Sequence, residues 1–364
     1  MENKKMRPGL LITFAGALLA YLIGSGTASG QESVQYFSSW GSVGGTITVA
    51  VVNFVVMFCC FMAYTYAGRH GTTDLASVCE FYCGKVVGKI FTAFAWIFNA
   101  CCFFFMISGF GNTLFQQWGL PLWIGYAIAI VLAVGTAVLG LQGIVNIIGK
   151  IGPVVVTFLF ILGVISAFTY FPSISNGVEL IRSGEVSVLQ AGANPVLAGL
   201  SFGGCSILLV AAYMSSIGKE LSGYKKKYTT VICIIGLCHL GNIAESSQAA
   251  IPNLLIANQV FGSASGILGA VFAVIILLSI YSTFCPMLWT CVSTFIKDEK
   301  SVKYKLACVL AGIGVFIVDM FIPYATLVNI IMTYCGYTGG IVFLVLTVRW
   351  LMVRNQDKKK MVSE

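Results

Sequence analysis

The stretch "LIGSGTASGQES", residues 22–33, interrupts the first apolar run of the chain with glycine and hydroxyl residues. It ends in Gln31, Glu32 and Ser33, side chains that a lipid-facing helix does not need. In hydrocarbon every backbone N–H and C=O needs a partner, so a helix break survives only where protein or a water-filled cavity covers it. The sequence therefore predicts a membrane helix that is broken within these residues.

A second interruption, "LSFGGCS" at residues 200–206, lies half a protein later. The free N–H groups at the ends of half-helices carry partial positive charge and bind anionic groups. Paired breaks in corresponding helices are typical of a binding site at the middle of the membrane. The alternative is that these glycines only let helices pack closely. The predicted substrate-binding residues are Gly24, Ser25, Gly26, Thr27, Asn99, Ser201, Gly203 and Gly204.

The composition indicates an integral membrane protein. Of 364 residues, 58% are hydrophobic and only 9% are charged, and the mean hydropathy is +0.92. Soluble domains carry about 25% charged residues. The net charge of +8 collects in short loops between apolar runs, which indicates membrane orientation and not nucleic-acid binding. The thirteen cysteines are predicted to be packing residues, with a metal site at Cys79, Cys83 and His70 as a weaker alternative.

The apolar runs predict an all-α protein with about ten membrane spans, since about 20 helical residues cross the bilayer core. With both termini inside, every Lys and Arg except Arg182 falls on the inner side. We therefore expect a multi-pass protein of the cell membrane with cytoplasmic termini. The predicted spans are 9–38, 43–67, 86–113, 122–140, 143–171, 195–218, 228–246, 264–296, 305–322 and 326–352.

The spans divide into two halves of five. Residues 9–171 form the first half, 172–194 an outer connecting loop, 195–352 the second half, and 353–364 a cytoplasmic tail. Five is an odd number, so the second half enters the membrane from the opposite side. This predicts a 5+5 inverted repeat in which spans one and six are broken. Between spans two and three, residues 72–83 predict a short amphipathic helix at the inner surface, capped by Thr72 or Thr73.

The motif "GSGTASGQE", residues 24–32, resembles the beginning of YkvI-type membrane proteins, a bacterial family similar to the amino acid–polyamine–organocation superfamily. The resemblance implies a LeuT-like fold and a transport role, but it implies no substrate. Gly24–Gly26 resembles the glycine motif that contacts substrate carboxylates in that superfamily. Thr27 departs from the pattern, because a bulkier apolar residue is expected there.

Span eight carries Ser279, Ser282 and Thr283 at positions i, i+3 and i+4, so their side chains share one helix face. Hydroxyl and carbonyl oxygens suit a hard cation. The resemblance implies that Ser282 and Thr283 bind Na⁺ together with the backbone carbonyls of Ala20 and Ile23. The alternative is that the hydroxyls bond the carbonyls of their own helix.

Glu32 is a second candidate for ion coupling, through H⁺. An unbroken helix from Pro8 would place Gln31 about 36 Å along its axis, at the outer interface. A broken helix would turn Glu32 toward an outer vestibule. We therefore expect an acid that is not deep, acting as a gate or coupling group or simply lying at the interface. Asp319 and Glu245 are predicted to be structural acids at the outer boundary.

Other polar residues within the spans have two interpretations each. Asn99 lies mid-span among apolar residues, where it either hydrogen-bonds another helix or lines the pocket. Aromatic and hydroxyl side chains later in the chain are candidate pocket walls or lipid-facing residues: Tyr213, Thr333, Tyr334 and Tyr337.

These features favour a secondary transporter that works by alternating access. A carboxylate-bearing zwitterion such as an amino acid fits as substrate, with Na⁺ or H⁺ as coupling ion and no other cofactor. The expected partners are the small-molecule substrate and the lipid bilayer, and no nucleic acid; the sequence does not predict an oligomeric state. The alternative is a transporter-like sensor or a passive channel without ion coupling. Motifs of metalloproteases, nucleophile elbows and phosphate loops are absent from the sequence, so an enzyme is not expected.

Overall fold

The computed structural model describes residues 30–72, 74–138, 161, 174–185, 188–220, 265–296 and 298–363. The predicted span 228–246 lies outside the described residues, as do Ala20, Ile23, the motif Gly24–Thr27 and, except for residue 161, the predicted span 143–171. The described elements are η1 (Ser33–Phe37), η2 (Ser38–Trp40), α3 (Val43–Arg69), α4 (Leu75–Trp118), α5 (Leu122–Val138), α7 (Ile174–Ser183), α8 (Pro195–Glu220), α11 (Ser265–Ser293), α12 (Val302–Asp319) and α13 (Tyr324–Ser363).

Each predicted span that falls wholly on described residues coincides with a helix. The match is closest for α3, predicted at 43–67, and for α8, predicted at 195–218. Helix α3 begins where Ser42 caps it by accepting a hydrogen bond from the N–H of Gly45. The all-α architecture is confirmed for the part of the chain that the structure describes.

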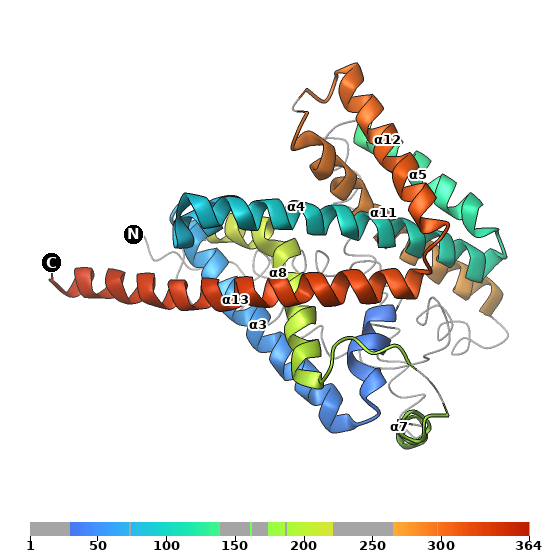
Figure 1. Cartoon of the computed structure of the whole chain (residues 1–364), viewed down its shortest axis with the longest axis horizontal. Coiled ribbons are helices and arrows are strands. Elements are labelled where there is room, and N and C mark those ends of the chain that lie inside the picture. The colour runs from blue at the N-terminus through green and yellow to red at the C-terminus, as the bar shows by residue number, and fades with distance from the viewer. Residues whose placement is uncertain are drawn as a thin grey trace.

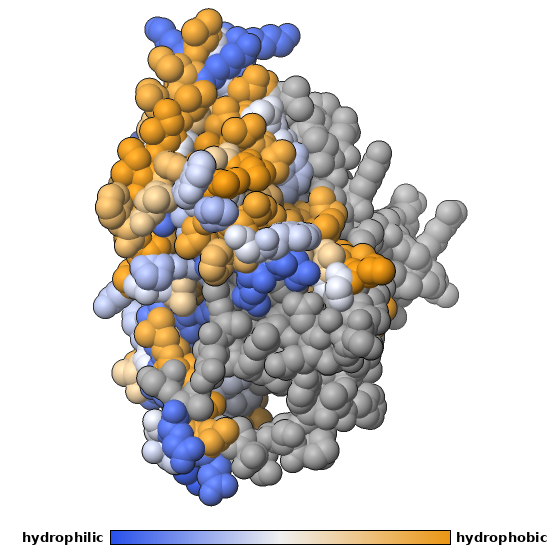
Figure 2. Space-filling model, turned by 90° about the vertical axis from the view of Figure 1, so that its right-hand side faces the viewer, coloured by the Kyte–Doolittle hydropathy of each residue, from blue (hydrophilic) through white to orange (hydrophobic). Residues whose placement is uncertain are grey.

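The helices carry apolar side chains on their outer faces as well as in the core. Val43, Ile47, Val51 and Val55 form an exposed stripe along α3, each 47–59% exposed. Helices that are apolar on every side are typical of a membrane environment. Four described helices are long and apolar enough to cross a bilayer, with ranges Val43–Arg69, Leu75–Trp118, Gly269–Ser293 and Tyr324–Asp357. Figure 2 shows apolar side chains grouped over the upper part of one face, with hydrophilic residues at its top and bottom edges.

The described helices pack as two groups joined by α4. Helices α3, α8 and α13 contact one another, and α5, α11 and α12 form a second set of mutual contacts. Helix α4 packs against α11 and α5 on one side and α13 on the other. Figure 1 shows α5 and α12 together at one corner of the molecule, with α4 and α13 extending across it. The core therefore continues from one group to the other through α4.

The predicted break in span six is wrong, because Pro195–Glu220 forms the continuous helix α8. The glycines serve close packing instead. A Cβ on Gly204 would lie 2.1 Å from the carbonyl oxygen of Gly336 and 2.7 Å from the nitrogen of Gly340, both in α13. A Cβ on Gly203 would meet Val56 of α3 at 2.9 Å. The backbone of α8 thus passes between α3 and α13 with no room for a side chain at these points.

A short helix, predicted at 72–83, is present as the first part of α4; its place at the inner surface stays a prediction. It turns into the long part at Gly84, whose φ of +78° is available to glycine at little cost. The cap differs from the prediction, because Asp74 and not Thr72 or Thr73 caps the helix. The carboxylate of Asp74 accepts from the N–H of Ser77 at 2.7 Å, and the Ser77 hydroxyl oxygen accepts from the N–H of Asp74.

Helix α13 continues well past the predicted span 326–352. Its 40 residues correspond to about 60 Å at 1.5 Å per residue, twice the thickness of a bilayer core. Near its end Asp357 accepts a hydrogen bond from the hydroxyl of Tyr66 at the end of α3. The ring of His70 lies 3.9 Å from the same carboxylate. These contacts fasten the extension of α13 to α3.

We predict that Gly204→Ala destabilises the protein by about 1–3 kcal/mol, because the added methyl group meets backbone atoms that can move away only if α8 and α13 separate. The measurement is the thermal midpoint of the purified protein in detergent. Gly314→Ala on α12 is the matched control, since a Cβ there meets nothing within 4 Å. An equal fall in the two midpoints would contradict the packing role of Gly204.

Candidate functional site

Residues that follow the glycine motif form a short π-helix, η1. A helical turn leads into η1 from Gly30, whose φ of +89° favours glycine, and the carbonyl of Gly30 accepts from the N–H of Val34 at 3.0 Å. π-Helical turns are rare and occur frequently at functional sites. In this turn Gln31, Glu32 and Gln35 are all buried, with exposed fractions of 6%, 6% and 1%. Buried polar side chains need hydrogen-bond partners, so those of this turn must find them within the turn or on other elements.

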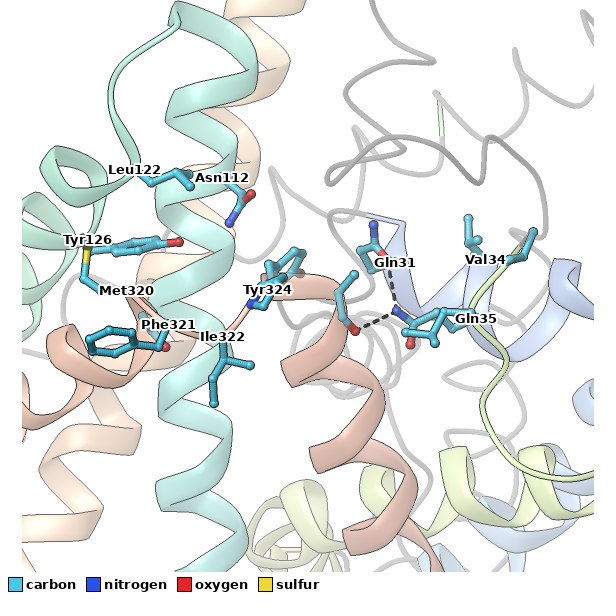
Figure 3. Close-up of a pocket in the computed structure, with 15 residues that line it drawn as sticks. Gln31, Val34, Gln35, Asn112, Leu122, Tyr126, Met320, Phe321, Ile322 and Tyr324 are labelled. Atoms are coloured by element: carbon cyan, nitrogen blue, oxygen red, sulfur yellow. Dashed lines mark hydrogen bonds between the residues drawn. The ribbon is translucent and has the colours of Figure 1, made fainter. Parts of the chain in front are cut away.

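Gln35 connects η1 to the beginning of α13. Its side-chain nitrogen donates to the Gln31 side-chain oxygen at 3.2 Å and to the carbonyl of Ala325 at 3.1 Å, as Figure 3 shows. Its side-chain oxygen accepts from Asn329 at 3.2 Å. The backbone carbonyl of Gln35 accepts from the N–H of Ala191 at 3.1 Å, which attaches the loop before α8. This residue fixes the position of η1 against two other parts of the chain.

Glu32 lies inside the bundle, which corrects the prediction of an acid at the outer interface or vestibule. It is 6% exposed. Its carboxylate is within electrostatic reach of the thiols of Cys102 and Cys205 and of the phenol of Tyr36. Cys102 and Cys205 lie in the interiors of α4 and α8, so Glu32 sits where these helices meet. Its depth is set by the helices it packs between and not by the length of chain that precedes it.

Tyr36, which the sequence analysis did not select, completes this buried cluster. It is fully buried, and its ring packs on Phe202 of α8 with centroids 5.0 Å apart. Its hydroxyl lies beside Ser201 of α8 and Thr333 of α13. Thr333 had been a candidate pocket wall. The i, i+4 spacing of Glu32 and Tyr36 was the available signal, because residues at that spacing share a helix face.

Ser201, a predicted substrate residue, belongs to the same cluster and joins α8 to α13. Its hydroxyl donates to the carbonyls of Met332 and Thr333 at 3.1 and 3.0 Å. Gly203 and Gly204 lie next to it in the helix contacts described above. The structure thus brings Ser201 close to Tyr36, while Tyr334 is 69% exposed and points away from the core.

Asn99 lies apart from this cluster and ties α4 to α11. Its side-chain nitrogen donates to the carbonyl of Met287 at 3.0 Å and to the thiol of Cys291 at 3.3 Å. The first of the two interpretations, a hydrogen bond to another helix, is therefore confirmed. Its role in substrate binding stays a prediction.

The hydroxyls of the predicted sodium site bond to their own helix. Ser282 and Thr283 both donate to the carbonyl of Ser279, at 2.7 and 3.0 Å. A hydroxyl that donates its proton keeps two lone pairs as acceptors. The oxygens therefore keep the capacity to hold a cation, and binding of Na⁺ at this position stays a prediction.

The comparisons with known proteins address the fold. No known family model matches the chain. The uncharacterized protein YyaD of Bacillus subtilis (strain 168) is 29% identical over 208 residues, which is 57% of this chain and 56% of that protein. The match therefore spans about half the length of this curated relative. The resemblance to YkvI-type proteins stays a prediction.

Two solved structures match nearly the whole chain. MhsT in complex with L-phenylalanine has a TM-score of 0.56 and 11% identity, covering 94% of this chain and 89% of that one. The fold is LeuT-like. A manganese transporter of Eremococcus coleocola has a TM-score of 0.51 and 13% identity, covering 97% and 88%. At these identities the similarity describes the LeuT-like architecture alone.

We predict that Gln35→Leu destabilises the protein by about 1–3 kcal/mol, because it removes the buried side chain that accepts from the half-buried amide of Asn329 and donates to the carbonyl of Ala325. The thermal midpoint in detergent measures the effect. Gln356→Leu makes the same chemical change at an exposed position of α13 and should leave the midpoint nearly unchanged. A similar midpoint for both variants would contradict the connecting role of Gln35.

Proposed function

We propose that this protein is a secondary active transporter that works by alternating access. Its substrate is a small metabolite with a carboxylate, such as an amino acid or a related zwitterion. It lies in the cell membrane with both termini in the cytoplasm, in the orientation that the basic residues favour. The two halves of the chain form an inverted repeat, and the free amides of Gly24–Thr27 hold the substrate carboxylate.

The observation that carries this proposal is the buried acid Glu32 within a LeuT-like bundle. An ionisable side chain inside a membrane protein is costly and is retained mostly where it serves transport or pairs with a ligand. Glu32 follows the glycine motif directly and lies between α4 and α8. The similar solved structures are those of MhsT, with L-phenylalanine bound, and of a manganese transporter.

Glu32 is proposed as the group that couples transport to H⁺. A carboxyl group that is neutral when protonated and charged when deprotonated has a different solvation cost in the two states. Exposure of Glu32 to one side of the membrane and then to the other would let it take up and release a proton during each cycle.

Sodium at span eight is the alternative coupling ion. Ser282 and Thr283 present hydroxyl oxygens on one face of α11, where the carbonyls of Ala20 and Ile23 would complete the site. Coupling to H⁺ requires Glu32, whereas coupling to Na⁺ requires Ser282 and Thr283. Transport measured on variants of these residues therefore distinguishes the two coupling ions.

We predict that Glu32→Gln abolishes accumulation driven by an inward H⁺ gradient and leaves exchange of substrate across the membrane. The measurement is uptake of a radiolabelled amino acid, chosen from a screen for ligands that raise the thermal midpoint, into proteoliposomes. Glu179→Gln replaces an exposed acid of α7 and serves as the matched control. Unchanged H⁺-driven accumulation in the Glu32→Gln variant would remove Glu32 as the coupling group.

For the sodium alternative we predict that Ser282→Ala with Thr283→Ala abolishes stimulation of uptake by Na⁺. Thr294→Ala is the control, because Thr294 also bonds a carbonyl of its own helix but is exposed at the end of the apolar segment. Equal stimulation in the double variant and the native protein would exclude this site. Equilibration that no ion gradient drives would favour the passive channel.

A further inference from the structure

Asp319, the last residue of α12, is a buried acid whose charge is not balanced by the part of the chain that the structure describes. It is 3% exposed. Both carboxylate oxygens are buried, and neither accepts a hydrogen bond from any described residue. A buried carboxylate is stable only when it is paired, hydrogen-bonded or protonated. The sequence predicts only a structural acid at this position and names no partner for its carboxylate. A ligand bound next to Asp319 could supply that partner.

A cavity of about 440 Å³ adjoins Asp319 at the ends of α4, α5 and α12 and the beginning of α13. Figure 3 shows Asn112 and Tyr126 on one side, Gln31 and Gln35 on the other, and Tyr324 between them. Its volume lies within the range of about 300–1,000 Å³ that is typical of small-molecule sites. The walls also include apolar side chains such as Leu122 and Phe321.

The polar groups around this cavity are suited to a ligand that donates hydrogen bonds. The side-chain nitrogen of Asn112 already donates to the carbonyl of Ser108 at 2.9 Å, and the side chain also lies beside the hydroxyl of Tyr126. Its amide oxygen has two lone pairs and can accept a hydrogen bond from a ligand. The side-chain nitrogen of Gln35 is likewise committed to Gln31 and Ala325. Among the described residues that line the cavity, Asp319 is the charged one, and none is Lys, Arg or His.

We propose that this cavity binds an organic ammonium ion, with Asp319 as its counter-ion. The carboxylate supplies the charge, and the acceptor oxygen of Asn112 supplies a hydrogen bond. Tyr126 lines the same cavity. A bare metal ion is less well matched, because the described residues contain no group of three His, Cys, Asp or Glu side chains and the cavity is much larger than an ion. The site is separate from Glu32, which lies among Cys102 and Cys205.

The test uses three probes of similar shape and different charge on the full-length protein in detergent. Phenethylamine is a cation at neutral pH, 2-phenylethanol is neutral, and 3-phenylpropanoate is an anion. Isothermal titration calorimetry should show phenethylamine binding at least about tenfold more tightly than the other two, because only the amine carries a positive charge that the carboxylate of Asp319 attracts. A tenfold difference corresponds to about 1.4 kcal/mol. Equal affinities for the amine and the alcohol would overturn the proposal.

Asp319→Asn should remove this preference, while Asp298→Asn, at an exposed acid before α12, should keep it. The Asn variant should fold at least as well as the native protein, because it removes a buried charge that has no described partner. Asn112→Leu is a second variant that should weaken phenethylamine binding even if Asp319→Asn fails to fold. Unchanged binding in the folded variants would overturn the proposal.

Glu32→Gln separates the two acids. It should leave phenethylamine binding unchanged; loss of binding in this variant with retention in Asp319→Asn would place the ammonium at Glu32 and overturn the proposal. Titration with NaCl and KCl tests a bare ion. If Na⁺ alone stabilises the native protein through Asp319 and phenethylamine shows no preference, the cavity holds an inorganic cation and the proposal fails.

Discussion

Helix α8 touches α3 and α13 backbone to backbone, and the buried cluster around η1 is built on these contacts. At one end of α8 a Cβ on Gly68 of α3 would lie 2.0 Å from the carbonyl oxygen of Ser215. In the first half of α8 a Cβ on Gly339 of α13 would lie 2.2 Å from the carbonyl oxygen of Gly204. Close approach strengthens dispersion contacts and brings polar side chains within reach of neighbouring carbonyls. Ser201 and Tyr36 meet because the helices that carry and flank them lie this close.

The positions of the described spans were predictable because hydrophobic length and charge distribution are properties of the sequence alone. The role of the Gly203–Gly204 pair was not. A pair of glycines is compatible both with an unwound backbone and with a tightly packed helix, and the sequence of one helix does not distinguish them. The glycines of α13 at positions 336, 339 and 340 were the relevant evidence, since contact between backbones requires small residues on both helices.

The chemistry of the site was only partly predictable for a similar reason. Glu32 was identified from its place after the glycine motif, but its depth depends on α4 and α8, which are distant in the sequence. Asn99 could be recognised as a polar residue that needs a partner, although nothing in its neighbourhood pointed to Met287. Asp319 was read as a boundary acid because it ends a span. Only the folded chain reveals that its carboxylate is enclosed and that the residue borders an open volume.

The long helix α13 gives the molecule a rigid strut between two distant points. Its first turn accepts the hydrogen bond from Gln35 and borders the cavity, and Asp357 near its far end is bonded to Tyr66. An α-helix rises 1.5 Å per residue, so a tilt at one end displaces the other end by an amount that grows with the number of residues between them. A small tilt of α13 where η1 contacts its first turn would therefore become a larger sideways displacement at the far end of the helix, near Asp357.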